Sequence, residues 1–170
     1  MAAAQESQAA QWARLVDRYI EEGSFADAER LVKRMLEFGA GDERTERLYR
    51  SLQNWKYLDV RNGVLVRYTG RASALTLPGC IQVIEDGAFQ DNRRLTAVTL
   101  PASVRMIEDG AFRGCINLKM VNTQGGVELV GKAAFENTPY DPMRTGRCLH
   151  CGGEISVFGK CKNCGRLRAK

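Results

Sequence analysis

The feature that most constrains this chain is a pattern written three times at intervals of 23 residues. Ile84–Phe89 (IEDGAF) returns as Ile107–Phe112 and, in a degraded form, as Val130–Phe135. A fixed period of roughly 20 to 50 residues is typical of repeat proteins, in which each unit buries its apolar face against its neighbours. The sequence therefore predicts a stack of repeats between about Leu75 and Pro139.

Each repeat is expected to hold one short strand, a proline-containing turn, an apolar pair and a turn of helix at Gly-Ala-Phe. The strand pattern is Leu95-x-x-Val98-x-Leu100, and it recurs from Leu118. Before the first repeat, residues 57–68 alternate or run apolar on both sides of Asn62-Gly63, a dipeptide that suits a tight hairpin turn. This segment predicts a β-hairpin at the start of the stack.

The run Leu-Pro-x-x-Val-x-x-Ile-x-x-Gly-Ala-Phe-x-x-Cys-x-x-Leu, from Leu100 to Leu118, resembles the BspA-like bacterial branch of leucine-rich repeat proteins. The resemblance covers about residues 57–140 and implies a short leucine-rich-repeat β-solenoid capped by the hairpin. It also implies that function lies on the solvent-exposed strand face. The candidate partner-binding face is Ser73, Thr76, Thr96, Thr99, Lys119, Met120 and Asn122.

Two cysteines lie within the repeats. Cys115 stands three positions before Leu118, where the previous repeat has Asn92 as a side chain able to satisfy backbone groups. We expect Cys115 to be a buried core residue, with a reactive thiol as the alternative. Cys80 aligns with Ser103 in a turn and is expected to be a lone thiol.

The N-terminal segment predicts helices. Apolar residues at spacings of three and four form two stripes between Gln11 and Phe38, separated by a break at Gly23 with Ser24 as a cap. A third helix is expected at about residues 42–54, capped by Asp42. The first two helices resemble a single tetratricopeptide repeat, through Trp12, Leu15, Tyr19, Gly23, Phe25 and Ala28. A helical cap or small bundle is favoured over a peptide-binding groove, because one such unit normally needs neighbours.

The C-terminal tail contains two Cys-x-x-Cys-Gly motifs. Cys148 and Cys151 form the first, and Cys161 and Cys164 the second. Four thiolates at this spacing complete a closed tetrahedral Zn²⁺ site with no open position for a substrate, so we expect one structural zinc ion per chain. The tail resembles a zinc ribbon. A redox Cys-x-x-Cys pair is the enzymatic alternative, and His150 is expected to face solvent.

The tail is also strongly basic. Residues 144–170 carry seven basic and one acidic side chain, a net charge of +6, and residues 1–54 carry eight basic and ten acidic side chains, a net charge of −2. The net charge of the whole chain is +5. Nucleic-acid contact through the tail is therefore the alternative function, although only one aromatic residue, Phe158, accompanies the charges. The candidate polyanion contacts are Arg144, Arg147, Lys160, Lys162, Arg166 and Arg168.

Taken together, the sequence predicts an α+β protein with three parts: a helical module (1–54), a leucine-rich repeat solenoid with a hairpin cap (55–140) and a zinc ribbon (141–170). No catalytic set appears, because the one histidine lies in the cysteine cluster. We expect a non-enzymatic adaptor that binds another protein. Without an apolar span or a basic, apolar leader at the N-terminus, a cytoplasmic location without membrane contact is expected.

Overall fold

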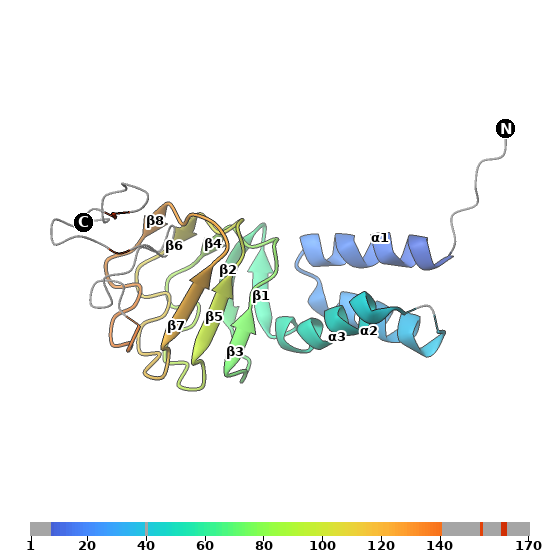
Figure 1. The fold of residues 1–170 in the computed structure, drawn as a ribbon, viewed down its shortest axis with the longest axis horizontal. Coiled ribbons are helices and arrows are strands. Elements are labelled where there is room, and N and C mark those ends of the chain that lie inside the picture. Colours follow the sequence, from blue (N-terminus) through green and yellow to red (C-terminus); the bar gives the residue numbers. More distant parts are fainter. Residues whose placement is uncertain (1–7, 40, 141–153, 155–160, 163–170) are drawn as a thin grey trace. The chain divides into compact units, whose positions relative to one another are not determined.

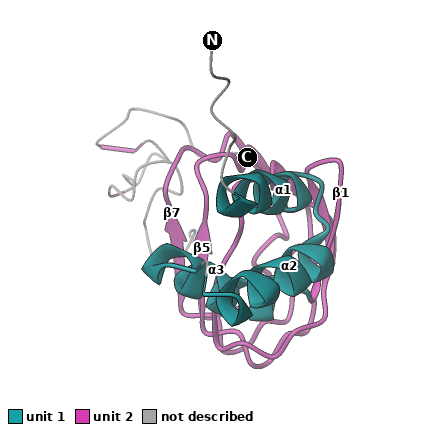
Figure 2. Ribbon diagram, turned by 90° about the vertical axis from the view of Figure 1, so that its right-hand side faces the viewer, with its two compact units in different colours: residues 1–56 teal, residues 57–170 magenta. Residues whose placement is uncertain are grey.

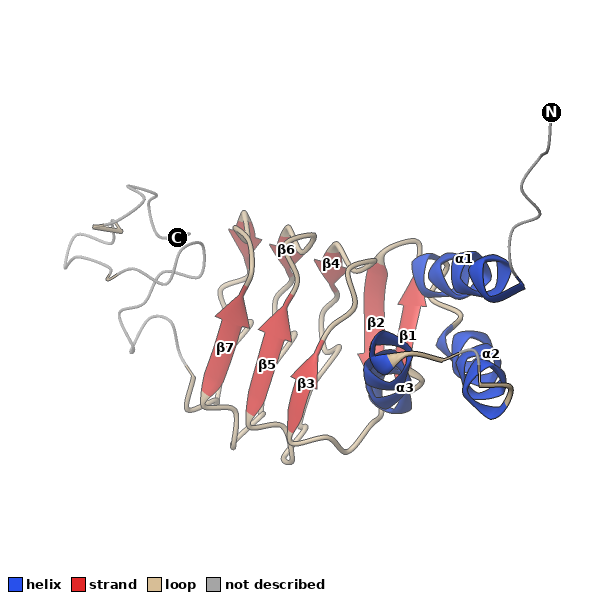
Figure 3. Cartoon of the chain, turned by 45° about the vertical axis from the view of Figure 1, so that its right-hand side comes forward, coloured by secondary structure: helices blue, strands red, loops and turns tan. Residues whose placement is uncertain are grey.

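The structure is a computed structural model that describes residues 8–39, 41–140, 154, 161 and 162 (Figure 1). In chain order, these residues form three helices followed by eight strands, a mixed α+β architecture (Figure 3). Contacts divide the chain into two compact units, residues 1–56 and residues 57–170 (Figure 2). The segment expected to form the zinc ribbon lies almost wholly outside the described residues.

The first unit contains helices α1 (Gln8–Glu21), α2 (Phe25–Glu37) and α3 (Glu43–Trp55). Gly23 separates the first two with a φ of 77°, a left-handed conformation that favours glycine. Asp42 caps α3 as predicted, since its Oδ1 accepts a hydrogen bond of 2.8 Å from the Thr45 N–H. Ser24 differs from the prediction: its side chain makes no capping hydrogen bond, and only its carbonyl accepts bonds from the first turn of α2.

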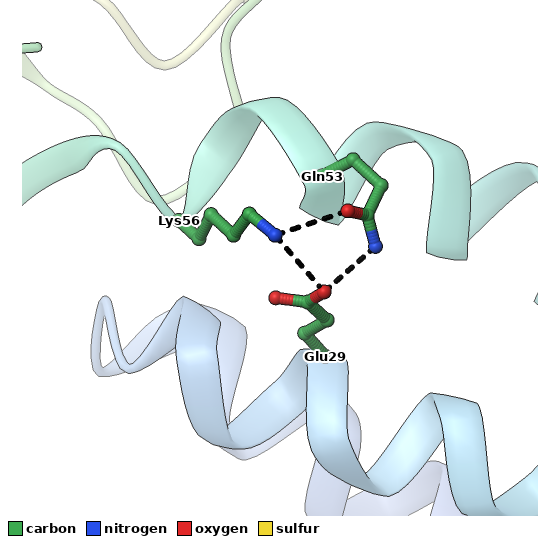
Figure 4. A network of polar contacts seen from close by, with 3 residues as sticks. All are labelled: Glu29, Gln53 and Lys56. Atoms are coloured by element: carbon green, nitrogen blue, oxygen red, sulfur yellow. Dashed lines mark hydrogen bonds and ion pairs between the residues drawn. The ribbon is translucent and has the colours of Figure 1, made fainter. Parts of the chain in front are cut away.

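Helix α2 packs against both α1 and α3. Its buried face holds Phe25, Ala28, Val32 and Met35, and the Phe25 ring lies 6.0 Å from the Trp55 ring of α3. A half-buried polar network joins the same two helices (Figure 4). Glu29 Oε1 accepts hydrogen bonds from Gln53 Nε2 at 2.7 Å and Lys56 Nζ at 3.2 Å.

The second unit begins with the predicted hairpin. Strands β1 (Leu58–Arg61) and β2 (Val64–Tyr68) pair antiparallel. The two residues between them both have positive φ, 49° at Asn62 and 79° at Gly63, as a tight primed turn requires. Strand β2 then pairs in parallel with β4, so the hairpin closes one sheet of the repeat stack.

The repeats build two sheets. One has the order β3-β5-β7, formed by β3 (Ala74–Thr76), β5 (Ala97–Leu100) and β7 (Met120–Thr123). The other has the order β1-β2-β4-β6-β8, with two-residue strands β4 (Val83–Ile84), β6 (Met106–Ile107) and β8 (Leu129–Val130). The strands of successive repeats pair in parallel, and each paired residue lies opposite the residue 23 positions later in the chain. The second sheet was not predicted.

An aromatic ladder runs through the core of the second unit. The rings of Phe89 and Phe112 stack with centroids 4.7 Å apart, and those of Phe112 and Phe135 stack at 5.1 Å. Tyr68 and Tyr140 contact the two ends at 5.5 and 5.2 Å with tilted or edge geometry. Stacking and burial of this kind explain why phenylalanine is repeated at this position.

The Gly-Ala-Phe segments are hydrogen-bonded turns rather than the predicted turn of helix. Ala88 and Gln90 donate to carbonyls three residues earlier, at Glu85 and Gly87. The N–H of Phe89 instead donates to the carbonyl of Ala111 in the next repeat, at 2.8 Å. Because the neighbouring repeat takes this donor, the intrahelical pattern cannot continue.

No helix among the described residues is long and apolar enough to cross a membrane.

Candidate functional site

The outward side of the β3-β5-β7 sheet presents the predicted face as in-register rows. Thr76 pairs with Thr99, which pairs with Asn122, and Ala74 is likewise followed by Ala97 and Met120. The alternate residues Leu75, Val98 and Val121 are buried. Since successive side chains of a strand point to opposite faces, burial of the second set directs the first set outward.

The side chains on this face differ in what else they do. Met120 is 52% exposed, and Asn122 Nδ2 lies 3.5 Å from its sulfur. The Thr96 hydroxyl donates a hydrogen bond of 2.8 Å to the carbonyl of Ser73, one repeat earlier. Thr96 therefore helps hold two repeats together, whereas Thr99 and Asn122 lie opposite each other in the paired strands β5 and β7.

A cationic edge borders the face where the strands begin. Arg71, Arg93, Arg94 and Lys119 are all exposed. Among the residues that the structure describes, none of these four side chains forms an ion pair. Of these four residues, the predicted partner-binding face included only Lys119. Arg71 and Arg94 lie one 23-residue period apart, and this spacing indicates that they share an edge of the repeat stack. This edge gives an otherwise uncharged surface a positive border.

Two acidic residues of the repeats accept hydrogen bonds from backbone groups of neighbouring repeats. Asp109 Oδ1 accepts a hydrogen bond of 3.3 Å from the Ala133 N–H, and Glu108 Oε2 accepts one of 3.2 Å from the Asp86 N–H. The Asp86 carboxylate also lies where a side chain on Gly110 would clash, which explains a glycine with a φ of 72° there. Within the described ranges, no three His, Cys, Asp or Glu residues are grouped to hold a metal ion.

The two repeat cysteines have structural surroundings. Cys115 is fully buried, and its Sγ donates to the Phe89 carbonyl at 3.0 Å. Burial raises the pKa of Cys115 to about 11, and it also raises the pKa of Cys80. A thiol with a raised pKa is a poor nucleophile near neutral pH, so the structure favours the core interpretation of Cys115 over the reactive one.

The structure describes one of the four predicted zinc ligands. Cys148, Cys151 and Cys164 lie outside the described residues, and Cys161 is buried. The Lys162 N–H donates to the Glu154 carbonyl at 2.8 Å, and Lys162 Nζ forms an ion pair with the Glu154 carboxylate at 3.0 Å. The other five predicted polyanion contacts, Arg144, Arg147, Lys160, Arg166 and Arg168, also lie outside the described residues.

Comparison with known proteins finds similarity to leucine-rich repeat proteins in the repeat segment. Residues 67–143 match the family described as "BspA type Leucine rich repeat region (6 copies)". A protein of known crystal structure, the T. pallidum leucine-rich repeat protein (TpLRR), is 30% identical over 48% of this chain, with a TM-score of 0.46. The match covers 44% of that protein, so this chain spans less than half of its length. No curated protein matches the chain.

Proposed function

We propose that residues 57–140 form a leucine-rich repeat solenoid that binds another protein through the outward face of β3, β5 and β7, and that the chain is a non-enzymatic adaptor. The observation that carries the proposal is the in-register, uncharged row Thr76, Thr99 and Asn122, with Met120 largely exposed beside it. The leucine-rich repeat match supports it, because stacked repeats commonly present extended binding surfaces. We place this adaptor in the cytoplasm, where thiolates remain available to bind metal.

The surface also defines what the partner should look like. Apart from Met120, the two rows of the sheet consist of the short side chains of Thr76, Thr99, Asn122, Ala74 and Ala97, which suit a shallow contact with a protein surface better than a deep insertion. The cationic edge at Arg71, Arg93, Arg94 and Lys119 favours carboxylates on the facing edge of the partner. Such rim charges mainly raise the association rate and make it depend on salt.

A pull-down with face variants tests the proposal. The double variant Thr99→Arg, Asn122→Arg places two long cations in the row without touching the Thr96–Ser73 hydrogen bond, and we expect it to lose specific partners. The control is Gln82→Arg, which adds a cation at an exposed position beside the other sheet and should retain them. Identical partner sets for wild type and the double variant would contradict binding through this face.

We further propose that residues 141–170 form a zinc ribbon with Cys148, Cys151, Cys161 and Cys164 as ligands. The donor set supports this, since four thiolates match a closed structural Zn²⁺ site. Burial of Cys161 and the backbone hydrogen bond from Lys162 to Glu154 suit a short hairpin. The ion would stabilise the fold of a segment too short to build its own core.

A further inference from the structure

The helical unit carries a groove that the proposed function does not use. It lies between α1 and α2, has a volume of about 430 Å³ and is lined by Trp12, Leu15, Tyr19, Asp27, Arg30, Leu31 and Arg34. Its lining combines two aromatic rings and two leucines with three charged side chains. The groove is therefore amphipathic, with apolar walls from both helices and charges contributed by α2 alone.

The apolar part of this groove is incompletely covered. Val16 is the single fully buried residue of α1, whereas Trp12, Leu15 and Tyr19 remain half-buried. Beyond the end of α2, Phe38 is 73% exposed, with its ring centroid 6.1 Å from that of Trp12. Exposed apolar surface in a concave site, bordered by polar groups, is typical of a binding site.

The charges of the groove select the kind of occupant. Arg30 and Asp27 form an exposed ion pair at 3.5 Å, a type of contact that contributes little stability. Arg34 has no carboxylate within ion-pair distance in the part of the chain that the structure describes. Two arginines and one aspartate give the lining a net charge of +1, so an incoming carboxylate meets one available guanidinium and one weakly held guanidinium.

A second copy of the chain fits this groove poorly. A two-fold interface brings the same patch of each copy together, so two linings that each carry a net positive charge would face each other. The groove is also short, because Tyr19 lies seven positions after Trp12 and the helix advances only about 10 Å over that separation. That length accommodates about three to four residues of extended chain.

A single helical hairpin lacks the extended groove of a stacked array, but its short groove is long enough for about three to four residues, and we propose that this groove between α1 and α2 binds a short acidic peptide segment that carries a bulky apolar residue. The apolar side chain packs against Trp12, Leu15 and Leu31, and its neighbouring carboxylates bind Arg34 and Arg30. This site lies in the helical unit and is separate from the strand face proposed above. Variants of that strand face should leave it unchanged.

A peptide titration tests the proposal on the full-length chain. The probe is the blocked peptide Glu-Glu-Leu-Phe-Glu-Asp, and the reporter is Trp12 fluorescence in a Trp55→Phe background, which retains an aromatic ring beside Phe25. We expect saturable binding that weakens with salt. Arg34→Glu should weaken it by about tenfold or more, because attraction becomes repulsion.

The controls separate this site from general electrostatic attraction. Lys33→Glu makes the same charge change on α2 outside the groove lining and should alter the affinity by less than about twofold, because exposed charges are well screened. A peptide with serine in place of its leucine and phenylalanine should not bind measurably. Equal weakening by the two variants, equal binding of the serine peptide or the absence of saturable binding would overturn the proposal. So would a fluorescence change that follows protein concentration without peptide, which indicates self-association.

Discussion

One turn position of the repeat is occupied by a different hydrogen-bonding side chain in each of three successive repeats. Asn92 Oδ1 accepts hydrogen bonds of 3.1 Å from the Arg94 and Leu95 N–H groups. One period later, the Cys115 thiol donates to a carbonyl, and one period after that the buried Thr138 hydroxyl donates to the Phe135 carbonyl at 2.8 Å. Buried backbone groups must find hydrogen-bond partners. The side chain at this position supplies such a partner in each repeat, although its chemical group differs.

Cys115 should therefore resist alkylation in the folded protein. With a pKa of about 11, only about one thiol in a thousand is ionised at pH 8. Iodoacetamide should modify Cys115 far more slowly than in urea-unfolded protein, as followed by peptide mass spectrometry, which resolves it from the other cysteines. Labelling at the unfolded rate would contradict its burial.

The same pKa predicts how stability depends on pH. The fold favours the neutral thiol, because burial disfavours the thiolate. The contribution of Cys115 is thus fully present below the ordinary thiol pKa and is lost as pH rises from about 9 to about 11.

At the scale of elements, the repeat period predicts some features of the second unit and misses others. The β3, β5 and β7 strands and the hairpin follow from local residues, because alternating apolar positions and Asn62-Gly63 carry their own signals. Strands of two residues, such as Val83–Ile84, are too short to show the alternation of apolar and polar residues that marks a strand, and they form only because neighbouring repeats pair with them. The cationic edge is equally non-local, since it exists only once repeats are stacked.

The aromatic ladder predicts a large effect at its centre. Phe112 is fully buried and stacks on both sides, so Phe112→Ala should lower the free energy of unfolding of the second unit by about 3–5 kcal/mol. Urea unfolding measures the change, from the part of the far-UV circular dichroism transition that tryptophan fluorescence of the helical unit does not follow. Ile116→Ala, at a half-exposed position of the same repeat, should change it by less than about 0.5 kcal/mol. Similar losses in both variants would argue against the ladder as the centre of the core.

At the scale of the whole molecule, the two units carry separate spectroscopic reporters. Both tryptophans, Trp12 and Trp55, lie in residues 1–56, and none lies in residues 57–170. Tryptophan fluorescence therefore follows the helical unit alone, whereas far-UV circular dichroism records both units, so a transition seen by circular dichroism and not by fluorescence belongs to the repeat unit. Perturbations of one unit can thus be assigned without cutting the chain.

The proposed zinc site can be tested by removing the metal while tryptophan fluorescence reports on the helical unit separately. If the four tail cysteines bind one structural ion, purified protein should contain about one zinc per chain, and the Cys161→Ser variant should lose most of it, because removing one thiolate opens the closed site. Chelation should make the tail sensitive to protease, since metal binding supplies most of the folding free energy of so short a segment. The urea transition seen by tryptophan fluorescence should not move, because the helical unit has its own core. Zinc content that is negligible in wild type, or unchanged in Cys161→Ser, would contradict the proposed ribbon, whereas a disulfide between Cys148 and Cys151 that turns over would favour the redox alternative.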